Sequence, residues 1–563
     1  MKNIFDHMKK FKKLAIIGAI VLTGTLTVGF TDSYFEISKN LEIFTTLYRE
    51  LNIYYVDETE PGELMKTGID AMLESLDPYT TYIAESDIED YRFMTTGQYG
   101  GIGSLIRKKD DVVVISEPYE GFPAQKAGLR AGDKILEVDG KSVVGKNTND
   151  VSSVLKGQAG TDVVIKVERP GVEEPFDVEL TREEIKIPDV PYYGFLDDEK
   201  KTGYIKLTSF THTASAGVRS SFKELKADGM ERLVFDLRGN GGGLLREAVN
   251  IVNLFVPKNQ LVVNTKGRIK DWDKTYKTLN EPIDKEMPII VLVDGSSASA
   301  SEIVSGALQD LDRAVIVGKL TYGKGLVQQT RELYYNSKLK LTVAKYYIPS
   351  GRCIQKVDYS HRDGNGKAIE VADSLIAQFE TKNGRPVFDG RGILPDVDVE
   401  DIEMGKIVSS IGGTDLFFEY ANKYRSEHDS ILPVDEFEIT DEMYADIVAF
   451  FNEKDFEHHT RTMDRLDDLK EMAEKEKYFD DASVEFEALK AALTPKKEND
   501  LIKFKDDIEM VIKNELIARY YFQTGRVQAS LETDPYIERS FKVFDEEYAG
   551  VLDGSLDTNE KSE

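Results

Sequence analysis

A serine and a lysine that could take part in catalysis stand 25 residues apart, each in a short run of small and polar residues. Ser299 lies in the run DGSSASASEIVSGALQD, and Lys324 lies in VGKLTYGKGLVQQ. A serine hydroxyl is a weak nucleophile that needs a base, and a lysine amine serves as that base when an apolar surrounding keeps it neutral. Lys324 stands between two glycines and close to Leu326 and Val327, which favours a tight, poorly hydrated turn. A serine and a neutral lysine that the fold brought together could carry out acyl transfer through a serine ester.

Simpler interpretations exist for parts of these runs. Ser299 followed by Glu302 matches a helix capping box, so the same turn can start a helix and present the hydroxyl. The segment from Gly318 to Gly325 nearly matches a phosphate-binding loop, but Gly325 stands where the magnesium-binding hydroxyl belongs, and a strand is expected to follow. The run GNGGG lacks the spacing of a dinucleotide-binding loop. A nucleotide site is therefore not expected.

Other catalytic groups have weaker support. A serine–histidine–aspartate triad needs a histidine, and the central region offers only His212 and His361, outside any motif. The S-x-x-K motif of penicillin-binding proteins occurs twice, at Ser220 with Lys223 and at Ser337 with Lys340. The S-D-N and K-T-G runs that accompany it in those proteins do not follow, so we interpret both matches as coincidence. Scattered histidines and a single cysteine, Cys353, predict no metal site, and no cofactor is expected. We interpret Cys353 as a small core residue.

The alternation of strands and helices from about residue 203 to 399 predicts an α/β core with mixed strand pairing. The expected strands are TGYIKL, RLVFDLR, PIIVLVD, RAVIVG and LKLTVAKYY, and the expected helices are Ala214–Leu225, Leu244–Leu254 and Ser301–Leu311. Ser299 would then lie at a helix N-terminus, where the helix dipole stabilises a developing negative charge.

The N-terminus predicts export. Five lysines precede the uncharged run of residues 14–30, which is at the short end of what spans a bilayer. No cleavage site follows clearly, so an uncleaved single-pass anchor is favoured over a cleaved signal peptide. The bulk of the chain is then expected on the periplasmic side of the cell envelope. Apolar residues at helical spacing predict helices in residues 32–96.

Residues 97–186 are rich in β-strand signals and contain AGLRAGDKILEVDG, a run that resembles a PDZ domain. The resemblance makes YGGIGSLI the carboxylate-binding loop, with backbone N–H groups from Gly101, Ile102 and Gly103. Such a loop holds the C-terminal carboxylate of a peptide that adds to the sheet as a strand. The alternative is a glycine-rich turn without a ligand.

The order and spacing of DLRGNGGG, SASASE and the lysine run resemble the carboxyl-terminal processing proteases, also called tail-specific proteases. The lysine run of that family reads T-F-G-K-G-x-V-Q, and only Tyr322 differs here. The resemblance extends from Phe35 to about Glu400, and includes YYVDE, SLDPYT, YYIPSGRCIQ and GILPDVDV. It implies a crotonase/ClpP-like protease core with an inserted PDZ domain, between a helical N-terminal region and a helical C-terminal extension.

The resemblance also implies residue roles. Ser299 would be the nucleophile, Lys324 the general base and Gln328 a residue that orients the lysine. Ala300 and a glycine of DLRGNGGG would donate N–H groups to the oxyanion; Gly242 is preferred, with Gly241 and Gly243 left open. Asp310 matches an aspartate of the family and is interpreted as structural.

The implied protein is an exported serine endopeptidase that cleaves proteins selected by unstructured, apolar C-termini, without metal or nucleotide. It would contact the membrane through its N-terminal segment, would bind no nucleic acid, and could form a homo-oligomer. One alternative is an inactive exported PDZ scaffold, and another is an esterase for small esters.

Composition supports a soluble multidomain class outside the N-terminal run. With 41% hydrophobic and 31% charged residues among 563, the chain is neither disordered nor a polytopic membrane protein. Its net charge of −29 opposes nucleic-acid binding, and residues 401–563, with 41 acidic and 20 basic side chains, carry −21 of it. That acidic helical region is expected to present a solvated face, or to dock a basic partner. The expected domains are the membrane anchor (1–31), the N-terminal helical region (32–96), the PDZ domain (97–186), the serine protease core (187–400) and the acidic helical C-terminal domain (401–563).

Overall fold

The computed structural model describes residues 34–556, apart from positions 198, 200, 401, 402, 457 and 459. The chain divides into two compact units. The first contains the residues up to Tyr82 together with Thr330–Leu341, and the second contains Ile83–Gln329 and the residues from Thr342 onward. The predicted membrane segment, residues 14–30, lies outside the described residues. Among the helices that are described, none has the length and apolar character needed to cross a bilayer.

The first unit is mainly helical, as the spacing of its apolar residues predicts. Residues 34–54 form one helix, and α2 spans Pro61–Glu74, with the proline in the first turn, where its missing N–H costs no hydrogen bond. The unit also holds the tip of a hairpin made by β17 (Leu326–Glu332) and β18 (Lys338–Tyr347). Tyr335 and Asn336 have φ of 54° and 53°, as a two-residue type I′ turn requires.

The second unit begins with the predicted PDZ region, an antiparallel sheet. β1 (Thr81–Ile83) lies at the boundary between the units. The elements from there to the end of the PDZ region are η1 (Glu85–Asp87), α3 (Ile88–Thr96), β2 (Gln98–Gly101), β3 (Ser104–Lys109), β4 (Val112–Pro118), α4 (Pro123–Lys126), β5 (Lys134–Val138), β6 (Lys141–Ser142), α5 (Thr148–Leu155), β7 (Asp162–Glu168), β8 (Phe176–Thr181) and β9 (Glu183–Lys186). The strand order β3-β4-β5-β7-β8 leaves β3 at one edge. Asp139 and Gly140 form the predicted hairpin turn, both with positive φ.

A mixed α/β core follows. Its elements are β10 (Tyr192–Phe195), β11 (Thr202–Lys206), α6 (Ala214–Ala227), β12 (Arg232–Asp236), α7 (Leu245–Phe255), β13 (Leu261–Gly267), η2 (Lys270–Trp272), β14 (Lys274–Lys277), β15 (Ile289–Val293), α8 (Ala300–Asp310), β16 (Val315–Gly318), β17, β18, β19 (Val357–Arg362), β20 (Ala368–Glu370), η3 (Asp373–Leu375), β21 (Gln378–Glu380), β22 (Pro386–Phe388) and β23 (Val397–Asp398). The three predicted core helices are present, displaced by no more than two residues at either end.

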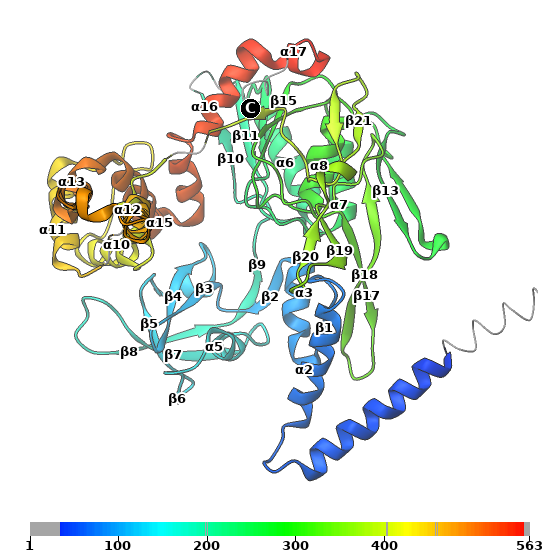
Figure 1. Cartoon of the computed structure of the whole chain (residues 1–563), viewed down its shortest axis with the longest axis horizontal. Coiled ribbons are helices and arrows are strands. Elements are labelled where there is room, and N and C mark those ends of the chain that lie inside the picture. Colours follow the sequence, from blue (N-terminus) through cyan, green and yellow to red (C-terminus); the bar gives the residue numbers. More distant parts are fainter. Residues whose placement is uncertain are drawn as a thin grey trace, which may run out of the picture. The chain divides into compact units, whose positions relative to one another are not determined.

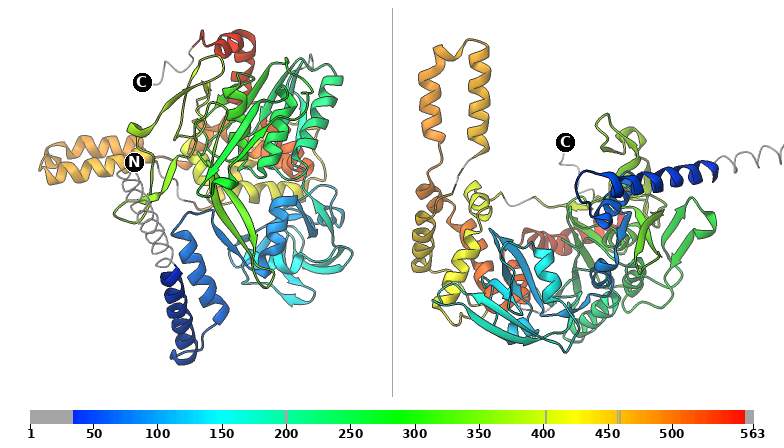
Figure 2. Two further views of the ribbon diagram at one scale, coloured as in Figure 1. Left: turned by 90° about the vertical axis from the view of Figure 1, so that its right-hand side faces the viewer. Right: turned by 90° about the horizontal axis from the view of Figure 1, so that it is seen from below.

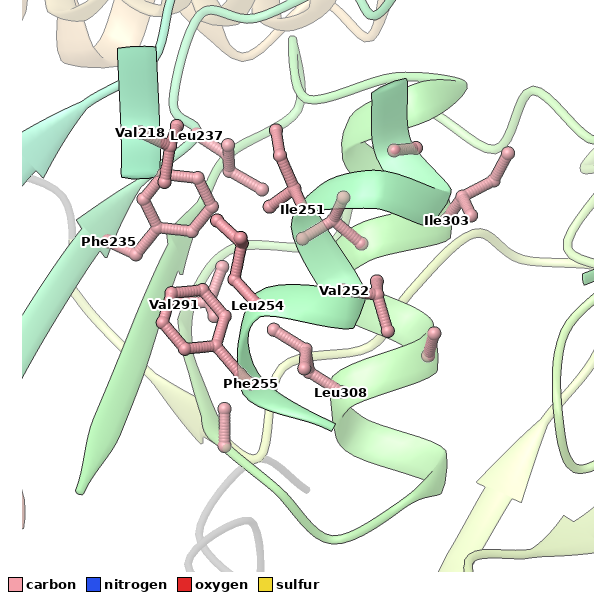
Figure 3. Packing of buried hydrophobic residues seen from close by; sticks show 14 of the residues in the cluster. Val218, Phe235, Leu237, Ile251, Val252, Leu254, Phe255, Val291, Ile303 and Leu308 are labelled. Atoms are coloured by element: carbon pink, nitrogen blue, oxygen red, sulfur yellow. The ribbon is translucent and has the colours of Figure 1, made fainter. Parts of the chain in front are cut away.

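The main sheet of the core has the order β10-β11-β12-β15-β16-β23. β10 is antiparallel to β11 and the other pairs are parallel, so the predicted mixed pairing is confirmed. Phe235 and Val291 lie on the face covered by α6, α7 and α8, where they form one cluster with Leu254 and Phe255 of α7 (Figure 3). Strands buried on both faces read as continuous apolar runs, as IIVLV does in β15.

A second sheet fixes the strand that carries Tyr346. β13 pairs antiparallel with β14 and with β18, and Tyr346 stands opposite Thr265 in that ladder. Tyr346 is almost completely buried, with 1% of its surface exposed. Its ring is therefore held by both the sheet and the core.

The C-terminal region is helical, as predicted. It contains α9 (Lys406–Gly412), α10 (Leu416–Glu427), α11 (Asp441–Glu453), α12 (Arg461–Lys475), α13 (Phe479–Leu493), α14 (Lys497–Lys503), α15 (Lys505–Ser530), α16 (Pro535–Lys542), η4 (Val543–Glu547) and α17 (Tyr548–Asp553). Helices α9, α10, α11, α14 and α15 share a core that includes Phe417, Phe451 and Ile512. α12 and α13 form an antiparallel pair (Figure 2). α15 is broken at Phe522, whose φ is 53°.

The end of this helical region covers the second face of the main core sheet (Figure 1). Ile537, Val543 and Val551 form one apolar cluster with Tyr204 and Val234 of the sheet. The alternation of side chains along β11 and β12 thus sends one set to α6–α8 and the other to α16–α17.

The same region is joined to the predicted PDZ region by ion pairs. Their members and distances are Arg107–Asp415 at 2.5 Å, Lys109–Glu419 at 2.6 Å and Arg526–Glu117 at 2.7 Å. The ring of Phe418 lies 4.2 Å from the Arg107 guanidinium, which adds a cation–π contact. The C-terminal helices therefore contact both the core and the PDZ region.

Candidate active site

Ser299 lies on the sharp connection between β15 and α8. It is the N-cap of α8 and has φ 56° and ψ −108°, a strained backbone conformation for a residue with a side chain. Asp294 stabilises the preceding turn, since its Oδ1 accepts the N–H groups of Ser296 and Ser297 at 2.9 Å each. The half-buried serine hydroxyl therefore lies at the start of the predicted helix.

Glu302 joins the serine turn to the lysine loop. Its Oε2 accepts the N–H of Ser299 at 2.7 Å and the N–H of Lys324 at 2.9 Å. Its Oε1 accepts the Thr321 hydroxyl at 2.6 Å and the Gly323 N–H at 2.7 Å. Burial raises the pKa of this fully buried carboxyl, and the four donors oppose that rise. The predicted Glu302 contact with Ser299 is present, and the same carboxylate also binds the loop of Lys324.

Tyr346 makes a second connection between these two segments. Its hydroxyl oxygen lies 2.5 Å from the Lys324 carbonyl oxygen and 3.1 Å from the Ser299 carbonyl oxygen. The backbones of Ser299 and Lys324 are therefore adjacent, each within one hydrogen-bond length of both Glu302 and Tyr346.

The glycines beside Lys324 allow a close approach of the backbone. A Cβ on Gly323 would lie 2.5 Å from Lys356 Cβ, and Gly323 has φ 87°. A Cβ on Gly325 would lie 2.8 Å from the Gln355 nitrogen. Lys324 is half-buried and is followed by β17, the strand that the sequence predicts there.

Gln328 lies on β17, and its side chain reaches the neighbouring strand. Its Nε2 donates to the Thr342 hydroxyl on β18 at 3.2 Å. This bond fixes the amide group on the same strand pair that carries Tyr346.

The glycine loop Leu237–Gly243, called the oxyanion loop below, passes directly beside Ser299. A Cβ on Gly242, whose φ is 101°, would lie 2.9 Å from Ser299 Cβ and 2.9 Å from the Ala300 nitrogen. The Gly242 N–H itself donates to Asn240 Oδ1 at 2.9 Å. Within the described residues, no acceptor lies opposite the N–H groups of Ala300, Gly241 or Gly243.

The other predicted groups are held in local contacts. Asp310 ends α8 and pairs with Arg352 at 2.8 Å, at the opposite end of the helix from Ser299. Burial raises the pKa of the Cys353 thiol, which opposes formation of a thiolate. Ser220 is exposed and donates to Glu224 at 3.0 Å. Among the described residues, no three His, Cys, Asp or Glu side chains are grouped to hold a metal ion.

The predicted carboxylate-binding loop lies at the start of edge strand β3. Ile102 is buried and Gly103 has φ 73°. The ring of Tyr99 lies against Gly101, where a Cβ would be 2.7 Å from Tyr99 Cε2. Burial raises the pKa of Tyr99 to about 12, although the backbones of Gly103 and Ser104 hydrogen-bond to its hydroxyl.

A small cavity of about 130 Å³ lies between β3 and α5. Its lining includes Ile102 and Ile106 from the β3 side and Leu155 from α5. An apolar cavity beside an unpaired strand edge is the arrangement in which a peptide strand binds with one side chain inserted.

Sequence reasoning identified Glu302 only as a capping residue, and it missed Tyr346 and Asn240. Glu302 carried a signal, because a buried acid three residues after the serine has more acceptor capacity than one N-cap N–H uses. Tyr346 lies in a run that fits any strand, and Asn240 in a run that fits any turn. Only the fold brings these side chains to the site.

Comparisons with known proteins identify the domains of this chain and its family. The model of peptidase family S41 matches residues 201–361, a PDZ domain model matches residues 114–169, and the model "Probable PDZ-protease, C-terminal helical domain" matches residues 407–544. A carboxy-terminal-processing protease of Bartonella bacilliformis is 36% identical over 323 residues, which cover 57% of this chain and 73% of that protein. A probable CtpA-like serine protease of Staphylococcus aureus is 35% identical over 364 residues, covering 62% and 71%.

Among solved structures, the photosystem II D1 C-terminal processing protease is 30% identical to this chain. The match covers 58% of this chain and 91% of that protein's chain, with a TM-score of 0.33. The identity and coverage of the two bacterial relatives confirm the predicted enzyme class, a serine-type peptidase, and the predicted multidomain fold with its PDZ domain. The chain belongs to the carboxy-terminal processing proteases of peptidase family S41.

Proposed function

We propose that this peptidase is an exported endopeptidase in which Ser299 is the nucleophile and Lys324 the general base. The observation that carries the proposal is the double connection between the two residues, through the Glu302 carboxylate and the Tyr346 hydroxyl. A base loop tied to the nucleophile turn by buried groups keeps a reacting pair in position without reorganisation during the reaction.

In the proposed reaction, Ser299 Oγ attacks the carbonyl carbon of the scissile peptide bond, and Lys324 Nζ takes the hydroxyl proton. The C–N bond then breaks, and the leaving amine receives that proton. Water then attacks the resulting ester and gives a proton to Lys324. The ester C–O bond breaks, Ser299 Oγ takes that proton from Lys324, and the new C-terminus is released. Gln328 on β17, whose amide group is held by the Thr342 hydroxyl of the neighbouring strand β18, orients the lysine.

The negative oxygen of the tetrahedral intermediate would be bound by the Ala300 N–H and by an N–H of the oxyanion loop. Ala300 starts α8, so the helix dipole favours the same charge. In the loop, Gly243 suits this role better than Gly242, because the Gly242 N–H already donates to Asn240. Gly242 serves by having no side chain where the loop meets Ser299.

Substrate selection is assigned to the PDZ domain. A C-terminal peptide would pair with edge strand β3, insert an apolar side chain between β3 and α5, and place its carboxylate at Gly101, Ile102 and Gly103. The carboxylate would meet the Gly103 and Ser104 backbone, which hydrogen-bonds to Tyr99 in this structure.

Export and membrane anchoring are proposed from the lysines before residues 14–30 and the apolar run itself. Mass spectrometry of the mature N-terminus and fractionation of cells test this. An intact N-terminus in the membrane fraction is expected. A chain that starts after residue 30 would point to a cleaved signal, and full-length protein in the cytoplasm would refute export.

The dyad is tested with Ser299→Ala and Lys324→Ala in the full chain. Each should lose cleavage of a protein that ends in an apolar tail, while the melting temperature stays close to that of the unchanged protein. Biological function that survives both changes would favour the scaffold alternative. Hydrolysis that ignores the tail and accepts small esters would favour the esterase.

A further inference from the structure

The oxyanion loop is held from outside the protease core, by a residue of the helical C-terminal region. Asp534 is the N-cap of α16. Its carboxylate accepts a bidentate pair of hydrogen bonds from Arg238, with Nη1–Oδ1 at 3.0 Å and Nη2–Oδ2 at 2.6 Å. Arg238 belongs to the run DLRGNGGG and precedes Gly242 by four residues. The two side chains are largely buried, with 16% of the Arg238 side chain and 10% of the Asp534 side chain exposed.

Arg238 lies in a cluster in which charge is balanced. Asp236, whose side chain is fully buried, accepts from Arg238 at 2.8 Å, and Lys206 lies 3.1 Å from the same carboxylate. The Arg238 guanidinium lies 4.6 Å from the Tyr536 ring, and the Lys206 amine donates to the Arg238 carbonyl at 2.8 Å. Two cations thus face two carboxylates, and removal of Asp534 leaves a buried excess of positive charge. Such an excess is costly, so the surrounding loop would shift to reach water.

The backbone after Arg238 connects this cluster to the nucleophile. Asn240 donates from Nδ2 to the Leu207 carbonyl at 2.8 Å, and its own carbonyl accepts the Ala298 N–H at 3.1 Å. The same carbonyl accepts the Ser301 hydroxyl at 2.8 Å. Asn240 therefore contacts the chain on both sides of Ser299, only two residues away from the arginine that Asp534 binds.

We propose that Asp534 is a positioning residue for the peptidase reaction. Through Arg238 it fixes the oxyanion loop beside Ser299, so the helical C-terminal region completes the active site instead of being a separate appendage. This inference rests on the proposed roles of Ser299 and of the oxyanion loop. Asp534 touches no substrate. Its replacement is therefore expected to weaken stabilisation of the oxyanion, and so to lower kcat, rather than to weaken substrate binding.

The same interface offers a control pair that is more exposed, with 59% of the Asp545 side chain accessible. Asp545 of η4 pairs with Arg232 at 2.5 Å, and this arginine also stacks on an aromatic ring, that of Phe544 at 4.9 Å. Arg232 starts β12, whereas Arg238 follows the end of the same strand. Both pairs join the C-terminal helices to β12, but only the pair at Arg238 leads into the oxyanion loop.

The test compares Asp534→Asn with Asp545→Asn in the full-length protein. The measurements are kcat and KM on a protein with an apolar tail, the melting temperature, and inhibition by a peptide boronate, whose tetrahedral adduct with serine resembles the intermediate. For Asp534→Asn, kcat should fall about 10- to 100-fold while KM changes less than about threefold, since displaced donors no longer meet the oxyanion. Boronate inhibition should weaken by a similar factor. Asp545→Asn should keep kcat within about twofold.

Equal kcat values for the two variants, at a temperature where both are folded, would overturn the inference. If Asp534→Asn does not fold, Asp534→Glu and Asp545→Glu replace the pair, and the same comparison decides. Ser299→Ala, measured alongside, separates the two proposals. Retained peptidase activity in Ser299→Ala would refute the proposed function itself. An inactive Ser299→Ala variant together with a fully active Asp534→Asn variant would refute only the inference about Asp534.

Discussion

Replacement of Glu302 by alanine should leave a protein that still folds, with reduced stability, but that has lost most of its peptidase activity. Glu302 is fully buried and accepts four hydrogen bonds, two on each oxygen. Three of the donors belong to the loop of Thr321–Lys324, and the fourth is the Ser299 N–H. Alanine removes every one of these connections and leaves the donors buried in the gap.

The size of the effect follows from these contacts. A hydrogen bond to a charged group contributes about 1.5–3 kcal/mol, and the energy released by no longer burying a carboxylate offsets part of the loss. We expect a net loss of stability of about 2–5 kcal/mol. Activity should fall further, because a displacement of about 1 Å between reacting groups costs about 100-fold in rate. The Tyr346 hydroxyl and the bond from the Tyr322 N–H to the Ser297 carbonyl, at 3.1 Å, would then still join the two segments.

The assay measures kcat on a protein with an apolar tail, at a temperature well below the melting temperature of the variant. Ser305→Ala is a matched control, since Ser305 is buried in the same helix and donates only to the Ser301 carbonyl. The kcat of Glu302→Gln should lie between the values for the unchanged protein and for Glu302→Ala. The amide oxygen of the glutamine still accepts two donors, while its NH₂ group faces the other two. A folded Glu302→Ala variant with kcat within about twofold of the Ser305→Ala control would refute the positioning role.

Three further predictions concern the same site. Gly242→Ala should abolish cleavage, since its Cβ would lie 2.7 Å from the Ala298 carbonyl oxygen, whereas Gly241→Ala, with open space around the new Cβ, should retain most activity; kcat of the two folded variants decides. Tyr346→Phe should lower stability by about 1 kcal/mol and reduce kcat, as measured by urea unfolding and steady-state assays, and an unchanged kcat would contradict its role. Asp236→Asn should destabilise the protein by about 3–5 kcal/mol at pH 7, because it leaves Arg238 and Lys206 unbalanced. Burial opposes ionisation of Asp236, but these two cations outweigh it and lower its pKa, so its contribution is present above about pH 4 and is lost as the pH falls towards the folded-state pKa. The difference in unfolding free energy between the unchanged protein and Asp236→Asn should therefore be constant above about pH 4 and narrow as the pH falls below it, and a difference that stays constant down to about pH 3 would contradict this sign.

The α/β core was predictable from the sequence because its strands are covered on both faces. A run such as IIVLV between turn signals has few alternatives, and the intervening helices show regular apolar spacing. Ser299 and Lys324 were identified as candidates by the resemblance of their runs to those of the processing proteases, and glycines and a capping acid in these runs restrict the backbone. For these elements, local signals and tertiary contacts favour the same conformation.

The supporting residues were not predictable in the same way. The bond from Glu302 to the Lys324 backbone spans 22 residues, and the bond from Arg238 to Asp534 spans 296. The local pattern does not point to either distant partner, because an acid at a helix N-cap and an acid three residues into a helix both have ordinary local uses. The availability of the Gly242 N–H likewise depends on the fold, because the Asn240 side chain accepts that N–H only in the folded loop.

The acidic C-terminal region is best understood through the basic groups that it contacts. Its carboxylates Asp415 and Glu419 pair with Arg107 and Lys109 of the PDZ domain, while Asp534 and Asp545 pair with the core.

Partly exposed pairs of this kind contribute only about 0–1 kcal/mol each, so they set orientation more than affinity. The apolar cluster of Ile537, Val543 and Val551 against the core sheet supplies the main attachment. The pair of Arg238 and Asp534 differs from the others because it is largely buried and adjoins the oxyanion loop. A basic partner for this region therefore already exists within the chain, and part of its negative charge serves to hold the PDZ domain and the protease core on one helical support.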